Sequence, residues 1–184
     1  MKRKTFGRMN CSIARALELV GEWWTMLILR EAFLGTRRFQ DFQRHLGIAR
    51  NILSARLKKL VTRGVLERAT APGGGRRLEY RLTEKGRAFF PVLMALMQWG
   101  DRFAACAGGP PVRVVERVSG TPIADIRVFS REGRPLTGAD VRIVPGPGAG
   151  ALTRARFKRT QPVRQAETAS APVDPGIRDE SEPR

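Results

Sequence analysis

The fold is decided by residues 39–82, which read FQDFQRHLGIARNILSARLKKLVTRGVLERATAPGGGRRLEYRL. In the first half of this stretch, apolar residues recur at the spacing that places them on one face of a helix. Gly47 and Gly64 follow the two periodic segments, and glycine commonly stands directly after the last helical residue. The pattern therefore predicts one helix over 39–46 and a second over about 50–63.

The spacing changes in the second half, from the helical period to that of strands. Residues 65–70 read as one strand, and residues 78–82 alternate apolar and polar side chains as a half-buried strand does. The glycine-rich segment 71–77 between them predicts a flexible hairpin tip with Arg76 and Arg77 at its exit.

Periodic apolar residues predict further helices on both sides of this stretch. Two precede it and end near Gly21 and Gly35, and a long one follows from an N-cap at Thr83 to about Ala105, kinked or delayed by Pro91. Four helices, a strand, a tip, a strand and a helix are the order of a winged helix-turn-helix, whose fourth helix here would enter the DNA major groove. The predicted fold class is mainly α with a small β wing, plus a small C-terminal β module.

Composition predicts four regions along the chain. These are a basic tail at 1–10, the winged domain at 11–106, a small metal-free β module at 107–145 and a disordered tail at 146–184. The module is inferred from three short alternating runs at 112–115, 126–129 and 141–144. We expect its apolar residues to pack on the main domain or on a second subunit; they are Val114, Ile123, Ile126, Val128, Val141 and Ile143.

The charge of the chain points to a polyanionic partner. The 184 residues include 34 Lys+Arg against 17 Asp+Glu, a net charge of +17. Residues 35–87 alone carry 14 basic and 4 acidic residues, a net of +10, so the charge is concentrated in the helix pair and the wing. This placement favours sequence-specific binding of double-stranded DNA. The bulk charge alone also fits a non-specific architectural nucleic-acid-binding protein, which is the alternative.

The helix at 50–63 supplies most of the candidate DNA contacts. Its apolar stripe faces the core, which leaves polar residues for the outer face. There Arg50 can pair with guanine and Asn51 with adenine, each worth about 1–3 kcal/mol of discrimination between bases. Further along, Lys58 suits a phosphate. The predicted DNA-binding residues are Arg38, Arg50, Asn51, Ser54, Arg56, Lys58, Arg76 and Arg77.

Several other classes of protein are not expected. No run of 18 apolar residues or secretory signal occurs, so we expect a cytoplasmic protein without a membrane partner. A single histidine and two distant cysteines, Cys11 and Cys106, cannot complete a zinc site or a disulfide framework. We find no nucleophile–base set, no paired carboxylates in an apolar cleft and no phosphate-binding loop, so neither an enzyme nor a cofactor is predicted. For His45 we expect a solvent-facing or backbone-bonded role.

Short motifs occur in a fixed order over about residues 9–106. They run from Cys11-Ser12-Ile13-Ala14-Arg15-Ala16-Leu17 through Gly21-Glu22-Trp23-Trp24-Thr25, Arg38-Phe39-Gln40-Asp41-Phe42-Gln43 and Leu53-Ser54-Ala55-Arg56-Leu57 to Leu82-Thr83-Glu84-Lys85-Gly86. In this order they resemble the HxlR family of bacterial winged-helix transcriptional regulators, which is similar to the MarR group. The resemblance implies a homodimer formed through the first and last helices of the domain, readout by the fourth helix and a wing that touches DNA. Independently, the last helix is apolar on more than one face, which favours a partner.

The resemblance also bears on the cysteines and on effectors. Cys11 matches a cysteine that senses oxidants or electrophiles in some members, and the alternative is a small packing residue. Some members carry paired Cys-Gly turns after the winged domain; those cysteines are absent here, so no metal is expected. The three tryptophans are more typical of core residues than of a ligand site. The alternative is that they form a site for a small aromatic effector near the dimer interface.

Overall fold

The structure is a computed structural model that describes residues 5–71 and 78–159. The chain divides into one compact unit that extends to Ile143 and a second unit that starts at Val144. Each is described below by itself.

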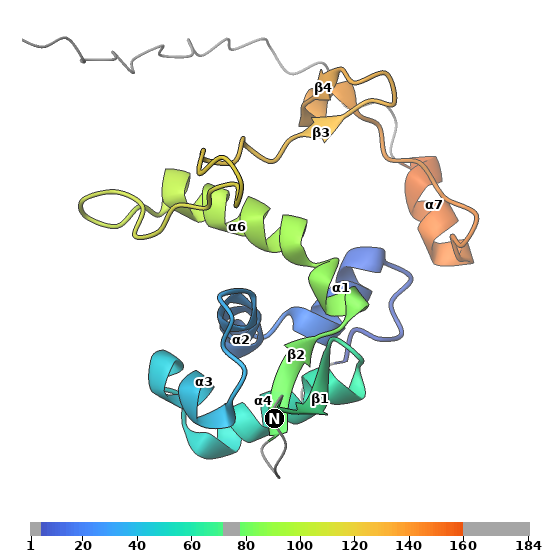
Figure 1. Cartoon of the computed structure of the whole chain (residues 1–184). Coiled ribbons are helices and arrows are strands. Elements are labelled where there is room, and N and C mark those ends of the chain that lie inside the picture. Colours follow the sequence, from blue (N-terminus) through green and yellow to red (C-terminus); the bar gives the residue numbers. More distant parts are fainter. Residues whose placement is uncertain (1–4, 72–77, 160–184) are drawn as a thin grey trace, which may run out of the picture. The chain divides into compact units, whose positions relative to one another are not determined.

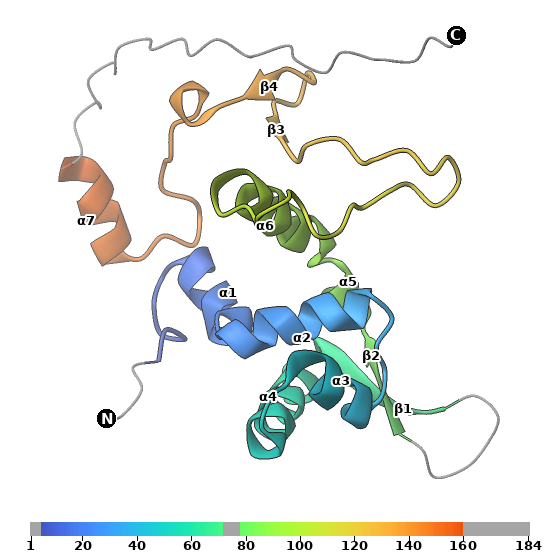
Figure 2. The same cartoon turned by 90° about the vertical axis from the view of Figure 1, so that its left-hand side faces the viewer.

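Most of the regular secondary structure of the first unit is helical, as Figures 1 and 2 show. The helices are α1 (Ser12–Val20), α2 (Trp23–Phe33), α3 (Phe39–Leu46), α4 (Arg50–Thr62), α5 (Glu84–Arg87) and α6 (Phe90–Phe103), with a 3-10 turn at Gly138–Asp140. The strands are β1 (Leu66–Thr70), β2 (Leu78–Leu82), β3 (Val128–Phe129) and β4 (Pro135–Leu136). In the second unit, α7 covers Ala151–Arg159.

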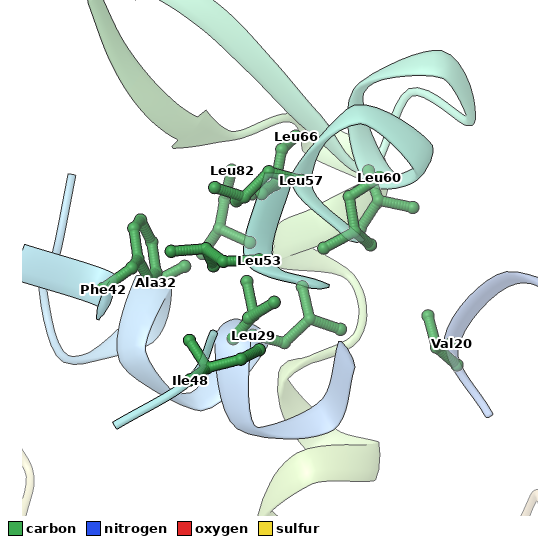
Figure 3. Packing of buried hydrophobic residues seen from close by; sticks show 12 residues of the cluster. Val20, Leu29, Ala32, Phe42, Ile48, Leu53, Leu57, Leu60, Leu66 and Leu82 are labelled. Atoms are coloured by element: carbon green, nitrogen blue, oxygen red, sulfur yellow. The ribbon is translucent and has the colours of Figure 1, made fainter. Parts of the chain in front are cut away.

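A single apolar cluster joins α2, α3, α4 and the two wing strands (Figure 3). It contains one face of α4 and the buried residues of β1 and β2, so the helix pair and the wing share one core. Its buried members are Val20, Ile28, Leu29, Ala32, Phe42, Ile48, Leu53, Leu57, Leu60, Val65, Leu66 and Leu82. Burying side chains of this size contributes about 1.5–3 kcal/mol each. The core therefore determines which face of α4 points inward.

The wing is an antiparallel pair in which Leu66 faces Leu82 and Thr70 faces Leu78. Together with the helices before it, this hairpin confirms the winged helix-turn-helix fold and the predicted strand at 78–82. The predicted long helix after Thr83 is divided: α5 ends at Arg87, and α6 begins with Pro91 in its first turn. Proline is well suited to that position, because its missing N–H would have no helical partner there.

The C-terminal β module is smaller than the sequence predicts. One predicted run forms β3, which pairs with Pro135–Leu136, and another contributes only the bridge between Val115 and Pro122. The predicted run 141–144 forms no strand, because alternation alone supplies no neighbouring strand to pair with. Ile126, Val128, Val141 and Ile143 are exposed in the single chain, so these four residues do not pack on the main domain. Their packing on a second subunit stays a prediction. The second small sheet itself is confirmed.

The predicted disordered tail contains a helix, α7. Gly, Pro, Ala and charged residues dominate residues 146–184 as a whole, but 151–159 read Ala-Leu-Thr-Arg-Ala-Arg-Phe-Lys-Arg, which are mostly strong helix formers. The prediction of disorder is therefore wrong for 151–159. Residues 160–184 lie outside the described part of the chain.

Candidate nucleic-acid interface

The turn between α3 and α4 sets the geometry of the helix pair. Gly47 ends α3 in the left-handed conformation (φ 61°), and its N–H donates to the carbonyl of Gln43. Ile48 then buries its side chain in the core, and Ala49 caps α4 in an extended conformation. A three-residue turn of this kind is short enough to hold the two helices in a fixed crossing, as a helix-turn-helix requires.

The outer face of α4 carries the candidate base-reading side chains. Leu53, Leu57 and Leu60 are buried, whereas Asn51, Ser54 and Lys58 are exposed on the side away from the core. Ala55 and Thr62 share this exposed side, although sequence reasoning did not select them. The first turns of α4 thus present short polar groups that can approach base edges.

Arg50 and Arg38 lie at the N-terminal ends of α4 and α3. Both side chains are exposed, and the Arg50 guanidinium lies over the ring of Phe39, 5.3 Å from its centroid. A cation over an aromatic face is stabilised by the ring quadrupole. The sequence analysis did not predict this contact of Phe39 with Arg50.

Arg56 has a different environment from the other candidates. Its Nη2 forms an ion pair with Oε2 of Glu22, and its side chain is only 25% exposed. Lys59 also approaches this carboxylate, with Nζ 3.4 Å from Oε1. Glu22 lies at the junction of α1 and α2, and no local pattern of the sequence links it to α4.

The base of the wing is tied to both helices of the pair. The backbone N–H of Tyr80 donates to the carbonyl of Arg37, which joins β2 to the segment before α3. Thr83 Oγ1 donates to the carbonyls of Gly64 and Val65, at 2.7 and 3.1 Å, which joins the end of β2 to the end of α4. The confirmed N-cap of Thr83 accepts from the N–H of Gly86. The wing arginines Arg76 and Arg77 lie outside the described residues.

A buried carboxylate supports the loop that leads into α3. Glu31 accepts hydrogen bonds from Arg30 Nη2 (2.9 Å) and Thr36 Oγ1 (3.1 Å), and His45 Nδ1 lies 3.0 Å from it. Burial raises the pKa of Glu31, but the hydrogen bonds from Arg30, His45 and Thr36 outweigh it and leave the pKa below its ordinary value. His45 is exposed, as a solvent-facing role requires. Its pairing with Glu31 is an additional contact that the sequence did not predict.

An open basic hollow of about 410 Å³ lies beside this cluster. It is lined by Leu34, Gly35, Thr36, Arg37, Arg38, Asp41, Arg44 and His45. Arg37 donates to the carbonyl of Ala32, and Arg44 pairs with Asp41. The side chain of Arg38 is exposed and has no protein partner among the described residues. The tryptophans do not line this hollow, so it is not the aromatic effector site left open by the sequence.

The remaining candidates are placed as follows. Cys11 stands directly before α1 and is exposed, as is Cys106. Over residues 5–71 and 78–159, no three His, Cys, Asp or Glu side chains gather as metal ligands would. In the same part of the chain, every helix is too short or too polar to cross a bilayer.

An apolar surface on α1 and α6 is left uncovered in the single chain. Ile13 and Leu17 of α1 are exposed, and so are Leu96, Trp99 and Phe103 of α6. The rings of Trp99 and Phe103 are in contact, with centroids 5.6 Å apart. These are the two helices through which the resemblance implies dimerisation.

Comparisons with known proteins agree with this geometry. The sequence profile of a family described as HxlR-like helix-turn-helix matches residues 19–107. The HTH-type transcriptional regulator MT3179 of Mycobacterium tuberculosis is 45% identical over 137 residues, 74% of this chain and 87% of the relative. The crystal structure of the transcription factor PA1607 is similar to this chain with a TM-score of 0.73 and 43% identity, and covers 78% of this chain and 100% of its own. The structure of PA1374 from Pseudomonas aeruginosa has a TM-score of 0.54 and 44% identity, over 79% and 99% of the two chains.

Proposed function

Because this chain belongs to the HxlR-like helix-turn-helix family of transcriptional regulators, we propose that it is a cytoplasmic homodimer that recognises a specific operator through α4. Its family consists of DNA-binding regulators rather than enzymes. The proposal that α4 recognises a specific operator is supported by the two faces of this helix. One face is apolar and buried, and the other is exposed and bears Asn51, Ser54 and Lys58.

In this proposal the contacts divide by chemistry. Arg50 and Asn51 pair with base edges in the major groove, and Ser54 adapts to either neighbouring base. Lys58 and Arg38 contact phosphates, which position the protein without reading sequence. Arg76 and Arg77 are proposed to bind flanking phosphates from the wing, and Arg56 supports α4 through Glu22 instead of touching DNA.

Dimerisation is proposed on the uncovered apolar surface of α1 and α6. Exposed apolar residues of this kind are typical of protein interfaces, where aromatic residues such as Trp99 and Phe103 are enriched. A twofold dimer places two copies of α4 in successive major grooves. The expected operator is then a pseudo-palindrome with half-sites about one helical turn apart.

The test is the ratio of affinities for the upstream region of the chain's own gene and for a scrambled duplex, measured at physiological salt. A specific regulator typically binds its operator about 10³-fold or more tighter. A ratio near one would instead favour a non-specific architectural protein, which the net charge of +17 also fits. An effector of the regulator, and sensing by Cys11, would then be sought as changes in this same ratio.

A further inference from the structure

Glu22 is a buried carboxylate that the proposed DNA contacts do not use. Only 8% of the residue is exposed. Most of the other described Asp and Glu residues are in contact with water. It caps α2, an 11-residue helix, and a carboxylate is favoured at a helix N-terminus by the helix dipole. A buried charge also needs a paired cation, because desolvation strongly disfavours it otherwise.

Two cations of α4, the helix proposed to enter DNA, meet Glu22. Arg56 forms an ion pair with one carboxylate oxygen, and Lys59 Nζ lies 3.4 Å from the other. These residues are three positions apart, so they share one side of α4 beside its apolar stripe. In Figure 2, α4 runs beneath the part of α2 that α1 joins, which is where Glu22 lies.

The pairing withdraws two cations from solvent. The side chains of Arg56 and Lys59 are 25% and 28% exposed, whereas Lys58 between them is exposed. Cations that reach phosphate add affinity for every DNA sequence equally, since that attraction carries no base information. Cations held by a protein carboxylate contribute nothing to such binding.

We propose that Glu22 is a specificity-determining positioning residue that holds Arg56 and Lys59 away from phosphate and adds to the restraint that the core places on the rotation of α4 about its axis. Two attachment points on one side of a helix restrain its rotation, so Asn51 and Ser54 stay directed at base edges. This inference rests on the proposed function, because it assumes that α4 binds DNA. Glu22 thereby raises the ratio of specific to non-specific affinity.

The experiment measures how the binding constant for a scrambled duplex depends on salt, for wild type and Glu22→Gln. Each cation released to a phosphate steepens the plot of log K against log salt by about 0.9. When the salt concentration is lowered fourfold, both proteins should bind this duplex more tightly. For each released cation, the gain in affinity of Glu22→Gln should exceed that of wild type by a factor of about 3.5. The affinity ratio between the duplex selected by wild type and the scrambled duplex should fall.

Two further variants separate this effect from general charge and from loss of structure. Glu132→Gln removes an exposed carboxylate in the turn between β3 and β4, so it matches the charge change and should leave the slope close to that of wild type. The triple variant Glu22→Gln, Arg56→Gln, Lys59→Gln should return the slope to the wild-type value. Thermal unfolding of every variant reports its stability separately.

Arg56→Gln keeps the test decisive even if Glu22→Gln does not fold. Because Arg56 is withdrawn from DNA in the wild type, this variant should leave the slope on the scrambled duplex unchanged. A slope shallower by about 0.9 would overturn the inference, as would a Glu22→Gln slope and affinity ratio equal to those of Glu132→Gln. If wild type itself does not discriminate between duplexes, the proposed function fails, which is a separate result.

Discussion

Replacing Gly86 with alanine should loosen the base of the wing. A Cβ atom at this position would lie 2.2 Å from the carbonyl oxygen of Val65 and 3.0 Å from Leu82 Cδ2. Ordinary contacts begin at 3.4 Å, so the backbone at Val65 must move by about 1.2 Å. That same carbonyl accepts both the N–H and the hydroxyl of Thr83, and the movement therefore strains the junction of β1, β2 and α5.

The expected change combines two opposing terms. Overpacking against backbone costs about 2–3 kcal/mol, and alanine recovers about 1 kcal/mol over glycine in a helix. The free energy of unfolding of Gly86→Ala, measured by urea denaturation, should thus be about 1–2 kcal/mol lower than that of wild type. The affinity for DNA is measured in parallel. Gly100→Ala is the matched control: nothing lies within 4 Å of its added methyl, so it should gain up to about 1 kcal/mol. A Gly86→Ala protein as stable as wild type would refute the reasoning.

Three further predictions concern base recognition, stability at low pH and dimerisation. Arg50→Ala should relax base preference at one position of each half-site by about 1–3 kcal/mol, and an unchanged footprint and preference in footprinting would contradict its role. Because the lowered pKa of Glu31 means that the ionised carboxylate stabilises the fold, this contribution is complete above the unfolded value of 4.5 and is lost as pH falls through the folded pKa. The stability difference between wild type and Glu31→Gln should therefore shrink in urea titrations below about pH 4.5, and a constant difference would argue against it. Leu96→Glu should produce monomers in sedimentation velocity, since it places a charge on the exposed apolar face of α6; a persistent dimer would move the interface elsewhere.

The elements that the sequence predicted well are those set by local rules. The helix over 39–46 and the strand over 78–82 have the predicted bounds, because apolar period and the stop at Gly47 are local signals. The helix at 151–159 was missed because composition was averaged over a long Gly- and Pro-rich tail. The predicted strand at 141–144 is absent because a strand also needs a neighbour, which alternation does not supply.

The candidate site could be predicted only in part, because only some of its features follow from local rules. Outward positions on α4 follow from helical geometry, so the exposure of Asn51, Ser54 and Lys58 could be foreseen. The pairing of Arg56 with Glu22, and that of His45 with Glu31, join residues far apart in sequence. Such contacts depend on how the helices pack, and no spacing in the sequence encodes them.

The central claim is that side chains on the outer face of α4 read base edges. It is tested most directly by selecting duplexes from a random library with wild type and with Asn51→Ala, and by comparing the resulting base preferences. We predict that the variant loses preference at one position in each half-site, by about 1–3 kcal/mol, and keeps it at the others. Identical preferences for the two proteins, or equal affinity of wild type for all duplexes, would contradict the claim.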